Sequence, residues 1–500
     1  MSYQNFNLNF FVFGGIMKLR IYTAGVLAML YFSLSVTSSA QTGKPYIHDP
    51  STIIQCDGKY YTFGTGGGGL ISEDGWTWNG GAVRPGGGVA PDVIHIGDRY
   101  YVSYAKGGGG LAGGHASNVY VMWTKTLDPK SPDFKFYDEN NIVASSDGVE
   151  DCDAIDPAFL LDPTTGKLWL SYGTYFGFIK IVELNPKTGK RVAGNKPVNI
   201  AIDCEATALM YRDGWYYLLG THGTCCDGAN STYNLRVGRS KKVTGPYLDN
   251  MGRDMLKGGG KLVAGASGTF MGLGHFGLLD LGDDVQKFSC HYEADLKQGG
   301  RSVLGIRPLL WKNGWPVGGD NFQEGTYEIQ SERSGYALEL AVDFVRMPGG
   351  MRFFRQNNDE PVKPVPPQSL ADDSKNWPNG NIEVRMGDFM VRPHQKWKIT
   401  PVEGVGGYPG SPFFKITIDS TDRALAATAD CEVITVPKFT GAPEQLWRID
   451  QLIDGTYRIM PKVIPNSKEP LALVAVGDCT PTLAKFDPKS DNSKWNFLKP

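Results

Sequence analysis

Short strand–turn–strand units recur along the first two thirds of this chain of 500 residues, and this repetition constrains the fold more than any other feature. In each unit an apolar segment, a turn containing Gly and an aromatic-rich segment follow one another, which is the pattern of a β-hairpin. The five units are Ile53–Phe63, Val93–Tyr104, Ala158–Tyr172, Ala208–Leu218 and the weaker Gly277–His291. Their number and spacing predict a five-bladed β-propeller over residues 41–320, with a β-sandwich as the alternative.

The pattern changes after Trp315-Pro-Val317, where a threefold repeat begins. Pairs of apolar segments are followed each time by a Trp, in the motifs Gln395-Lys-Trp397, Gln445-Leu-Trp447 and Ser493-Lys-Trp495. This repetition resembles the ricin-type β-trefoil of carbohydrate-binding modules, with residues 345–392 as an insertion in the first repeat. We therefore expect an all-β chain in which a β-trefoil-like domain spans residues 321–500. The Gln and Trp residues of the motifs are expected in its core, and the domain either binds sugar or is purely structural.

The first 40 residues have the composition of a secretory signal peptide. A basic segment at Met17–Arg20 precedes the apolar run Ile21–Val36, and Ser38–Ala40 supplies small residues for cleavage. Translation could begin at Met17, since residues 1–16 make a poor basic region. A retained membrane anchor is the alternative, but the apolar run is short for a span. We expect the mature protein to be secreted or periplasmic, without a stable membrane anchor.

Charge and cysteine content narrow the classes of partner and fold. The net charge of −2 leaves no basic surface to follow phosphates, so nucleic acid is not an expected partner. Aromatic residues make up 12% of the chain, which suits sugar stacking and aromatic cores equally. The eight Cys are too sparse for a disulfide scaffold. The adjacent pair Cys225-Cys226 is either two buried thiols or a vicinal disulfide beside an active site. Composition predicts no particular oligomeric state.

Three acidic residues stand before or at the start of strand-like segments: Asp49, Asp156 and Glu205. Carboxylates at such positions on separate blades would meet around the propeller axis, and hydrolysis of a glycosidic bond requires a converging acid and base. An Asp before Pro is more commonly a turn residue, so no member of the triplet is convincing by itself. Asp153 and Asp203 are close enough in sequence to be rivals, and alternation would put Asp203 on the same face as Glu205.

Four motifs together resemble family 43 glycoside hydrolases, and within them the arabinan-degrading branch. They are His48-Asp-Pro-Ser51, Ala90-Pro-Asp-Val93, Ala154-Ile-Asp-Pro157 and the stretch Gly223–Tyr233, all within residues 46–317. Two positions depart from the family's pattern. Thr207 stands where Pro is common, which weakens the assignment of Glu205, and Val89 stands where Trp is common.

The resemblance implies a propeller that hydrolyses with inversion at the anomeric carbon. Asp49 would be the general base, Glu205 the general acid, and Asp156 would raise the pKa of the acid. The expected substrate-binding residues are Asp92, Tyr175, Phe176, Cys225, Cys226, His291 and Arg307. His275 would lie near a metal ion, with calcium, held mostly by water, as the expected ion and with no organic cofactor.

The expected function is hydrolysis of α-L-arabinofuranosyl linkages in arabinan, or in arabinose side chains of plant cell-wall polysaccharide or oligosaccharide. Endo-action and exo-action both stay open, because loops at the propeller mouth decide the shape of the cleft. A β-xylosidase or galactosidase on the same scaffold is the enzymatic alternative. A non-catalytic carbohydrate-binding protein is the alternative from another class, although such a protein has no need of an acid–base pair.

Overall fold

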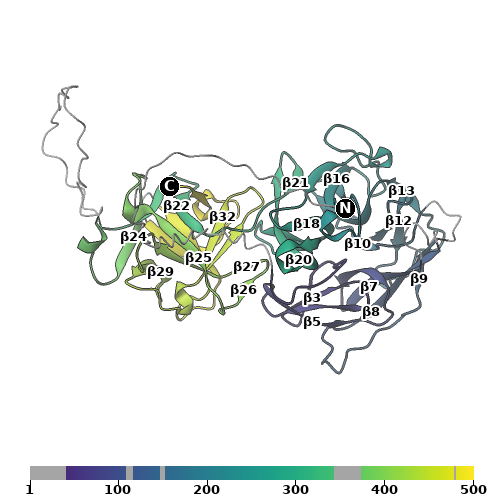
Figure 1. Cartoon of the computed structure of the whole chain (residues 1–500), viewed down its shortest axis with the longest axis horizontal. Coiled ribbons are helices and arrows are strands. Elements are labelled where there is room, and N and C mark those ends of the chain that lie inside the picture. The colour runs from purple at the N-terminus through teal and green to yellow at the C-terminus, as the bar shows by residue number, and fades with distance from the viewer. Residues whose placement is uncertain (1–40, 108–115, 147–151, 343–372, 478–479) are drawn as a thin grey trace, which may run out of the picture. The chain divides into compact units, whose positions relative to one another are not determined.

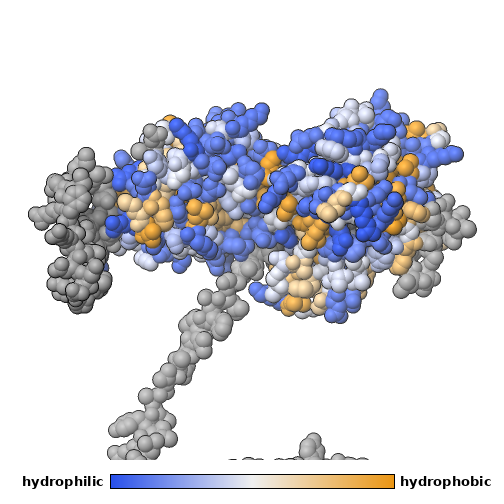
Figure 2. Space-filling model, turned by 90° about the horizontal axis from the view of Figure 1, so that it is seen from above, coloured by the Kyte–Doolittle hydropathy of each residue, from blue (hydrophilic) through white to orange (hydrophobic). Residues whose placement is uncertain are grey.

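The computed structural model describes residues 41–107, 116–146, 152–342, 373–477 and 480–500 (Figure 1). The predicted signal peptide, residues 1–40, and much of the predicted insertion lie outside these ranges. The described chain consists of β-strands joined by loops and short 3-10 turns, as the all-β prediction requires. Within these ranges no helix is long and apolar enough to cross a membrane. Figure 2 shows a mostly hydrophilic face on which apolar residues form small patches.

Five sheets, each built on four consecutive antiparallel strands, follow one another along the chain and form the blades of a β-propeller, and the first sheet has β1 as an additional strand (Figure 1). The arrangement confirms the predicted five-bladed propeller and excludes the sandwich, whose strands would form two facing sheets. The blades are β2 (Ile54–Cys56), β3 (Lys59–Phe63), β4 (Gly68–Ser72), β5 (Thr77–Val83); β6 (Val89–Ile96), β7 (Arg99–Gly107), β8 (Ser117–Thr124), β9 (Ile142–Ser145); β10 (Ala158–Leu161), β11 (Leu168–Tyr172), β12 (Ile179–Leu184), β13 (Val198–Ala201); β14 (Glu205–Arg212), β15 (Trp215–His222), β16 (Asn234–Ser240), β17 (Lys261–Ala264); and β18 (Phe270–Asp280), β19 (Gln286–Asp295), β20 (Arg301–Lys312), β21 (Trp315–Gly318).

The segment before Asp49 joins the first blade to the last. Strand β1 (Thr42–Gly43) pairs with β5 of blade one, whereas Leu304 of blade five donates its N–H to the carbonyl oxygen of Pro45 at 2.8 Å. Ile47 is buried in an apolar cluster that contains residues of both blades. Asp49 therefore follows a segment that is bonded both to blade one and to blade five.

One residue before or within the first strand of each blade has a left-handed backbone. The φ angles are 52°, 46°, 54°, 45° and 59° at Asp49, Ala90, Asp156, Ala206 and His275. The first strands contact one another from blade to blade, so these positions surround the propeller axis. A positive φ is uncommon outside Gly and concentrates at functional sites. The repeated conformation thus marks equivalent axial positions, two of which hold predicted catalytic carboxylates.

The C-terminal strands form a closed ring and three hairpins. The ring pairs six strands in turn, the last with the first: β22 (Gly325–Ser331), β25 (Trp397–Pro401), β28 (Phe414–Ile418), β31 (Trp447–Gln451), β32 (Tyr457–Pro461) and β35 (Trp495–Leu498). The hairpins are β23 (Ala337–Leu340) with β24 (Ile382–Gly387), β29 (Ala424–Ala427) with β30 (Val433–Val436), and β33 (Leu471–Val476) with β34 (Thr480–Lys485). A shorter pair joins β26 (Gly407–Tyr408) to β27 (Ser411–Pro412).

The three repeated Trp residues make equivalent contacts in this domain. Trp397, Trp447 and Trp495 are fully buried, each at the start of a ring strand. Their indole N–H groups donate at 2.7, 3.0 and 2.8 Å to the carbonyl oxygens of Leu338, Leu425 and Leu473. The core position predicted for the Gln and Trp residues is confirmed, since Gln395 and Gln445 are buried as well.

Candidate active site

The structure brings the three predicted carboxylates together from three blades. Asp49 precedes β2, Asp156 precedes β10 and Glu205 begins β14. Asp156 and Glu205 are 8% and 7% exposed, so both side chains are largely removed from water. Asp156 Oδ2 accepts the backbone N–H of Ala206 at 2.9 Å, which fixes this carboxylate beside the residue that follows Glu205.

Asp49 is surrounded by hydrogen-bond donors. His48 Nδ1 lies 2.9 Å from its Oδ2 and His275 Nδ1 lies 3.2 Å from its Oδ1. Thr65 Oγ1 donates to Oδ2 at 2.6 Å. Burial by itself would raise the pKa of Asp49, but the charges and hydrogen bonds of His275 and His48 outweigh it and hold the pKa well below its usual range. Asp49 is therefore ionised, which is the state that a general base needs.

Glu205 has the opposite environment. Burial first, and then the negative charge of Asp156, raise its pKa to about 9, although a hydrogen bond from the Tyr233 hydroxyl opposes the rise. Burial and the charge of Asp49 also raise the pKa of Asp156, to about 6, against the opposing charge of His275. Glu205 therefore keeps its proton near neutral pH while Asp49 has lost its own. Acid–base catalysis requires such a difference between the pKa values of the two groups.

Asp203 and Asp153, the two alternative candidates near these carboxylates in sequence, lie in different environments. Asp203 is exposed, whereas Glu205 is buried, so the shared face expected from strict alternation does not arise. The segment that holds both is a bend rather than a strand up to Glu205, because Asp203 has a φ of 59°. Asp153 is buried, and one of its carboxylate oxygens accepts from the Thr174 hydroxyl at 3.2 Å.

The predicted aromatic and sulfur residues lie beside the carboxylates. Cys225 and Cys226 form a vicinal disulfide, so the alternative of two free thiols is wrong for this structure. Both sulfurs lie within 4.8 Å of a ring nitrogen of His48. The Tyr175 and Phe176 rings contact each other with centroids 4.6 Å apart. Burial, with the nearby charge of Glu205, raises the pKa of the Tyr175 hydroxyl, which is hydrogen-bonded to the backbone of Cys225.

Three other residues predicted to bind substrate make hydrogen bonds within the protein. Both carboxylate oxygens of Asp92 accept backbone N–H groups, from Thr52 at 3.0 Å and Phe159 at 2.8 Å, and so link the first strands of neighbouring blades. His291 is completely buried behind Asp49 and accepts its backbone N–H on Nδ1 at 2.8 Å. Arg307 donates to the carbonyl of Gly319 and to Asp320 at the far end of the last blade. These contacts favour structural roles.

Sequence reasoning missed several residues of the site. His48 and Tyr233 lie inside the motifs His48–Ser51 and Gly223–Tyr233, but the motifs alone indicate no role for either residue. Glu293 is two residues after His291 in β19, and alternation puts the two side chains on one face. Period-two alternation was therefore the signal that could have identified Glu293.

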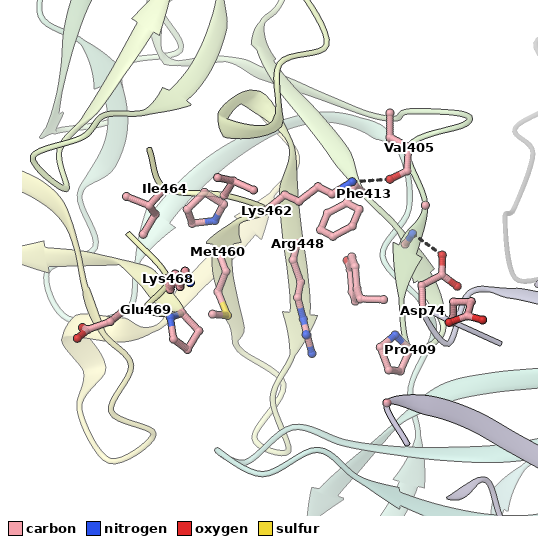
Figure 3. A pocket seen from close by; sticks show the side chains of 18 of the residues that line it. Asp74, Val405, Pro409, Phe413, Arg448, Met460, Lys462, Ile464, Lys468 and Glu469 are labelled. Atoms are coloured by element: carbon pink, nitrogen blue, oxygen red, sulfur yellow. Dashed lines mark hydrogen bonds between the residues drawn. The ribbon is translucent and has the colours of Figure 1, made fainter. Parts of the chain in front are cut away.

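One pocket is lined by residues other than the three carboxylates. It has a volume of about 780 Å³, and Figure 3 shows Asp74, Phe413, Arg448 and Lys462 among the residues that line it. Lys462 donates to the carbonyl of Val405 there, and the predicted site residues do not line this pocket.

Hydrolysis of a glycosidic bond needs one carboxyl group that donates a proton and one that accepts a proton from water. Two carboxyl groups at the propeller axis, Glu205 and Asp49, have pKa values shifted in the opposite directions that such a pair needs. Residues 62–316, just over half of the chain, match the glycosyl hydrolases family 43, and the chain belongs to this family.

Known arabinan-degrading enzymes are similar to this chain. It is 34% identical to the extracellular exo-alpha-(1->5)-L-arabinofuranosidase ArbA of Cellvibrio japonicus over 37% of this chain and 57% of that protein. It is 29% identical to the extracellular endo-alpha-(1->5)-L-arabinanase 1 of Bacillus subtilis, over 60% of this chain and 96% of that protein. The solved exo-1,5-alpha-L-arabinanase from a bovine ruminal metagenomic library is 32% identical over 55% of this chain and 97% of its own, with a TM-score of 0.50. The match to ArbA thus spans little more than half of that relative.

Proposed function

We propose that this protein is an exported hydrolase that cleaves α-L-arabinofuranosyl linkages in arabinan, or in arabinose side chains of plant cell-wall polysaccharide, with inversion of configuration. The observation that carries the proposal is the pairing of an ionised Asp49 with a protonated Glu205 on the axis of a family 43 propeller. The similar proteins named as arabinanases and arabinofuranosidases support the choice of sugar. Two of them are named extracellular, which supports export.

The proposed reaction uses the two carboxyl groups in one step. Asp49 removes a proton from water as the water attacks the anomeric carbon, and Glu205 donates its proton to the leaving oxygen. Asp156, beside Ala206, keeps Glu205 protonated through its negative charge. Inversion requires room for the water, which corresponds to a separation of about 6.5–9.5 Å between the two carboxyl groups.

Product analysis on linear and branched arabinan tests this proposal. Chromatography distinguishes arabinose released from chain ends from a ladder of oligosaccharides, and so separates exo-action from endo-action. Proton NMR of the first product should show the β-anomer, because inversion converts an α-linkage into a β-product. Activity only on β-xylosides or galactosides would show that arabinan is not the substrate. An α-anomer as the first product would contradict inversion.

Calcium at the propeller axis is proposed as well. His275, which lies at the axis beside the proposed base, would lie near the ion. Calcium takes 6–8 oxygen ligands, so water would complete the shell. The ion would stabilise negative charge near the base. Elemental analysis of the purified protein, and activity before and after chelation, test this proposal.

The C-terminal domain is proposed to be a β-trefoil that binds the polysaccharide. Its closed six-stranded ring, its three hairpins and the repeated Trp contacts support that fold. Deleting residues 321–500 should lower activity on polymeric arabinan more than on a small chromogenic arabinoside. An equal loss on both substrates would make the domain purely structural.

A further inference from the structure

We propose that Glu293, a carboxylate to which the reaction above assigns no role, is a positioning residue. It fixes the position of the general base relative to the loop that carries the Cys225–Cys226 disulfide. The disulfide loop is the segment of residues 223–232 between β15 and β16. The inference rests on the proposed function, because Asp49 is the base in that reaction. It concerns how Asp49 is oriented, and it does not assign a new reactive group.

One oxygen of Glu293 lies near nitrogen atoms from three different parts of the chain. Its Oε1 lies 3.2 Å from His48 Nε2, 3.3 Å from the backbone N of Cys226 and 3.5 Å from His291 Nε2. The side chain is only 3% exposed. A Cβ on Gly272 would lie 2.8 Å from the Cβ of Glu293, so Gly at this position leaves the carboxylate its space. Glu293 is thus buried and paired.

His48 connects Glu293 to the base. Its Nε2 faces Glu293, and its Nδ1 lies 2.9 Å from Asp49 Oδ2. Each ring nitrogen thus has a carboxylate oxygen within hydrogen-bond reach, and the two contacts together fix the orientation of the ring. Movement of Glu293 would therefore move His48 and, with it, Asp49.

His291 distinguishes this arrangement from a metal centre. His48, His291 and Glu293 place three ligand atoms within 4.8 Å of one another, which is close enough for a metal ion. However, Asp49 donates its backbone N–H to His291 Nδ1 at 2.8 Å, so Nδ1 carries no proton. A neutral ring then carries its proton on Nε2, which lies 3.5 Å from Glu293 Oε1. A ring nitrogen binds a metal only without its proton, so this tautomer disfavours a metal ion at the cluster.

The disulfide loop extends the network to the acid. Its two ends are joined by the side chains of Thr224 and Thr232, whose oxygens lie 3.2 Å apart. Directly after the loop comes Tyr233, which donates a hydrogen bond to Glu205. The loop is anchored to Glu293 through the backbone N–H of Cys226. Glu293 thus contacts His48, which lies beside the base, and is connected through the loop to Tyr233, which lies beside the acid.

Substitution of Glu293 in the full chain tests its role. Glu293→Gln keeps the shape but removes the charge that orients His48, and we expect kcat on an arabinofuranoside to fall about 10- to 100-fold. KM should change less than kcat, and the unfolding midpoint should stay within a few degrees of wild type. Glu293→Asp retains the charge and should recover part of the lost kcat. The matched control is Glu328→Gln, a buried carboxylate of the C-terminal domain, which should leave kcat unchanged.

Two outcomes would overturn the inference. Wild-type kcat in Glu293→Gln would show that Asp49 does not depend on Glu293. A loss of kcat that follows a loss of stability equally in the Gln and Asp variants would make Glu293 purely structural.

A second measurement does not depend on the substrate. Nitrogen NMR of the seven histidines at pH 7 should show His48 signals in Glu293→Gln that differ from those of wild type, because the ring loses the carboxylate at Nε2. An unchanged His48 signal contradicts the inference. If the wild-type protein cleaves no arabinofuranoside, the proposed function fails, and the NMR comparison still decides the role of Glu293.

Discussion

Glu205 and Asp49 carry the same functional group, and their neighbours shift its pKa in opposite directions. Burial and the anionic Asp156 favour the neutral form of Glu205. Two imidazoles and a hydroxyl favour the charged form of Asp49 despite its burial. At the scale of single residues, the charges around each carboxyl group therefore decide whether it keeps its proton near neutral pH.

The role of Glu205 can be tested with leaving groups of different acidity. We expect Glu205→Gln to lower kcat/KM on arabinan by about 10²- to 10⁴-fold, because the leaving sugar oxygen then receives no proton. A dinitrophenyl arabinofuranoside should lose far less, since its leaving group departs without protonation. Asp49→Asn is the matched control and should lose activity on both substrates alike. Equal losses for Glu205→Gln on the two substrates would contradict its assignment as the acid.

The pH dependence of kcat/KM reports the same asymmetry. Glu205 acts in its protonated form, so activity should fall as pH rises through about 9, well above the range of an ordinary Glu. Asp49 acts in its ionised form, and its lowered pKa should keep the acidic limb below the range of an ordinary Asp. Asp156→Asn removes a negative charge beside Glu205, so the alkaline limb should move to lower pH. An alkaline limb that stays in place in this variant would exclude Asp156 as the residue that raises the pKa of Glu205.

At the scale of elements, each blade presents an equivalent left-handed residue at the axis. Pro follows three of the five, at positions 50, 91 and 157, whereas Thr207 and Phe276 follow the other two. Thr207 therefore departs from the sequence pattern without changing the backbone conformation at Ala206. The departure that weakened the assignment of Glu205 has no structural counterpart at this position.

The disulfide loop is the element whose chemistry can be changed most simply. Reduction of Cys225–Cys226 by a phosphine yields two thiols and a phosphine oxide, and it removes the covalent constraint on the loop. We expect KM for arabino-oligosaccharides to rise about tenfold, because a looser loop must be ordered on binding. The double variant Cys225→Ala/Cys226→Ala should show the raised KM from the start and no response to the phosphine. Thiol titration confirms that the disulfide is reduced. If KM of the reduced wild-type protein is then unchanged, the prediction is contradicted.

At the scale of the whole molecule, a buried ionic cluster includes residues of the last blade and of the C-terminal domain. Lys287 of β19 is 2% exposed, and its Nζ lies 3.8 Å from Asp450 Oδ1 in β31. Arg448 and Arg458 donate to the other oxygen of Asp450 at 2.6 and 2.9 Å. Burial opposes the charge of Asp450, but these cations hold its pKa below the usual range.

Substitution of Asp450 tests whether this cluster stabilises the protein. Asp450→Asn would leave buried positive charges without their anion, and we expect it to lower the free energy of unfolding by about 3–5 kcal/mol. Asp454→Asn provides the control, because its ion pair with Lys494 is partly exposed and contributes less than about 1 kcal/mol. Denaturant unfolding of both variants gives the comparison. Similar small losses in the two would show that the cluster contributes little.

Patterns among neighbouring residues were sufficient to predict much of this protein. A hairpin such as Val93–Tyr104 depends on alternation and a turn within a few residues, so it is visible in the sequence. The spacing of Trp397, Trp447 and Trp495 likewise indicated a repeated core. The order of the motifs around Asp49, Asp156 and Glu205 was enough to identify the carboxylates that the structure brings together.

Contacts between distant residues were decided only by the tertiary structure. Glu293 lies 245 residues from His48, and nothing near either residue in sequence indicates that they meet. The sequence determined which carboxyl groups are present and which blade carries each, because strands β2 to β21 build the five blades in chain order. The folded propeller decided which group keeps its proton, because burial and neighbouring charges act through space and arise only when the five blades surround one axis.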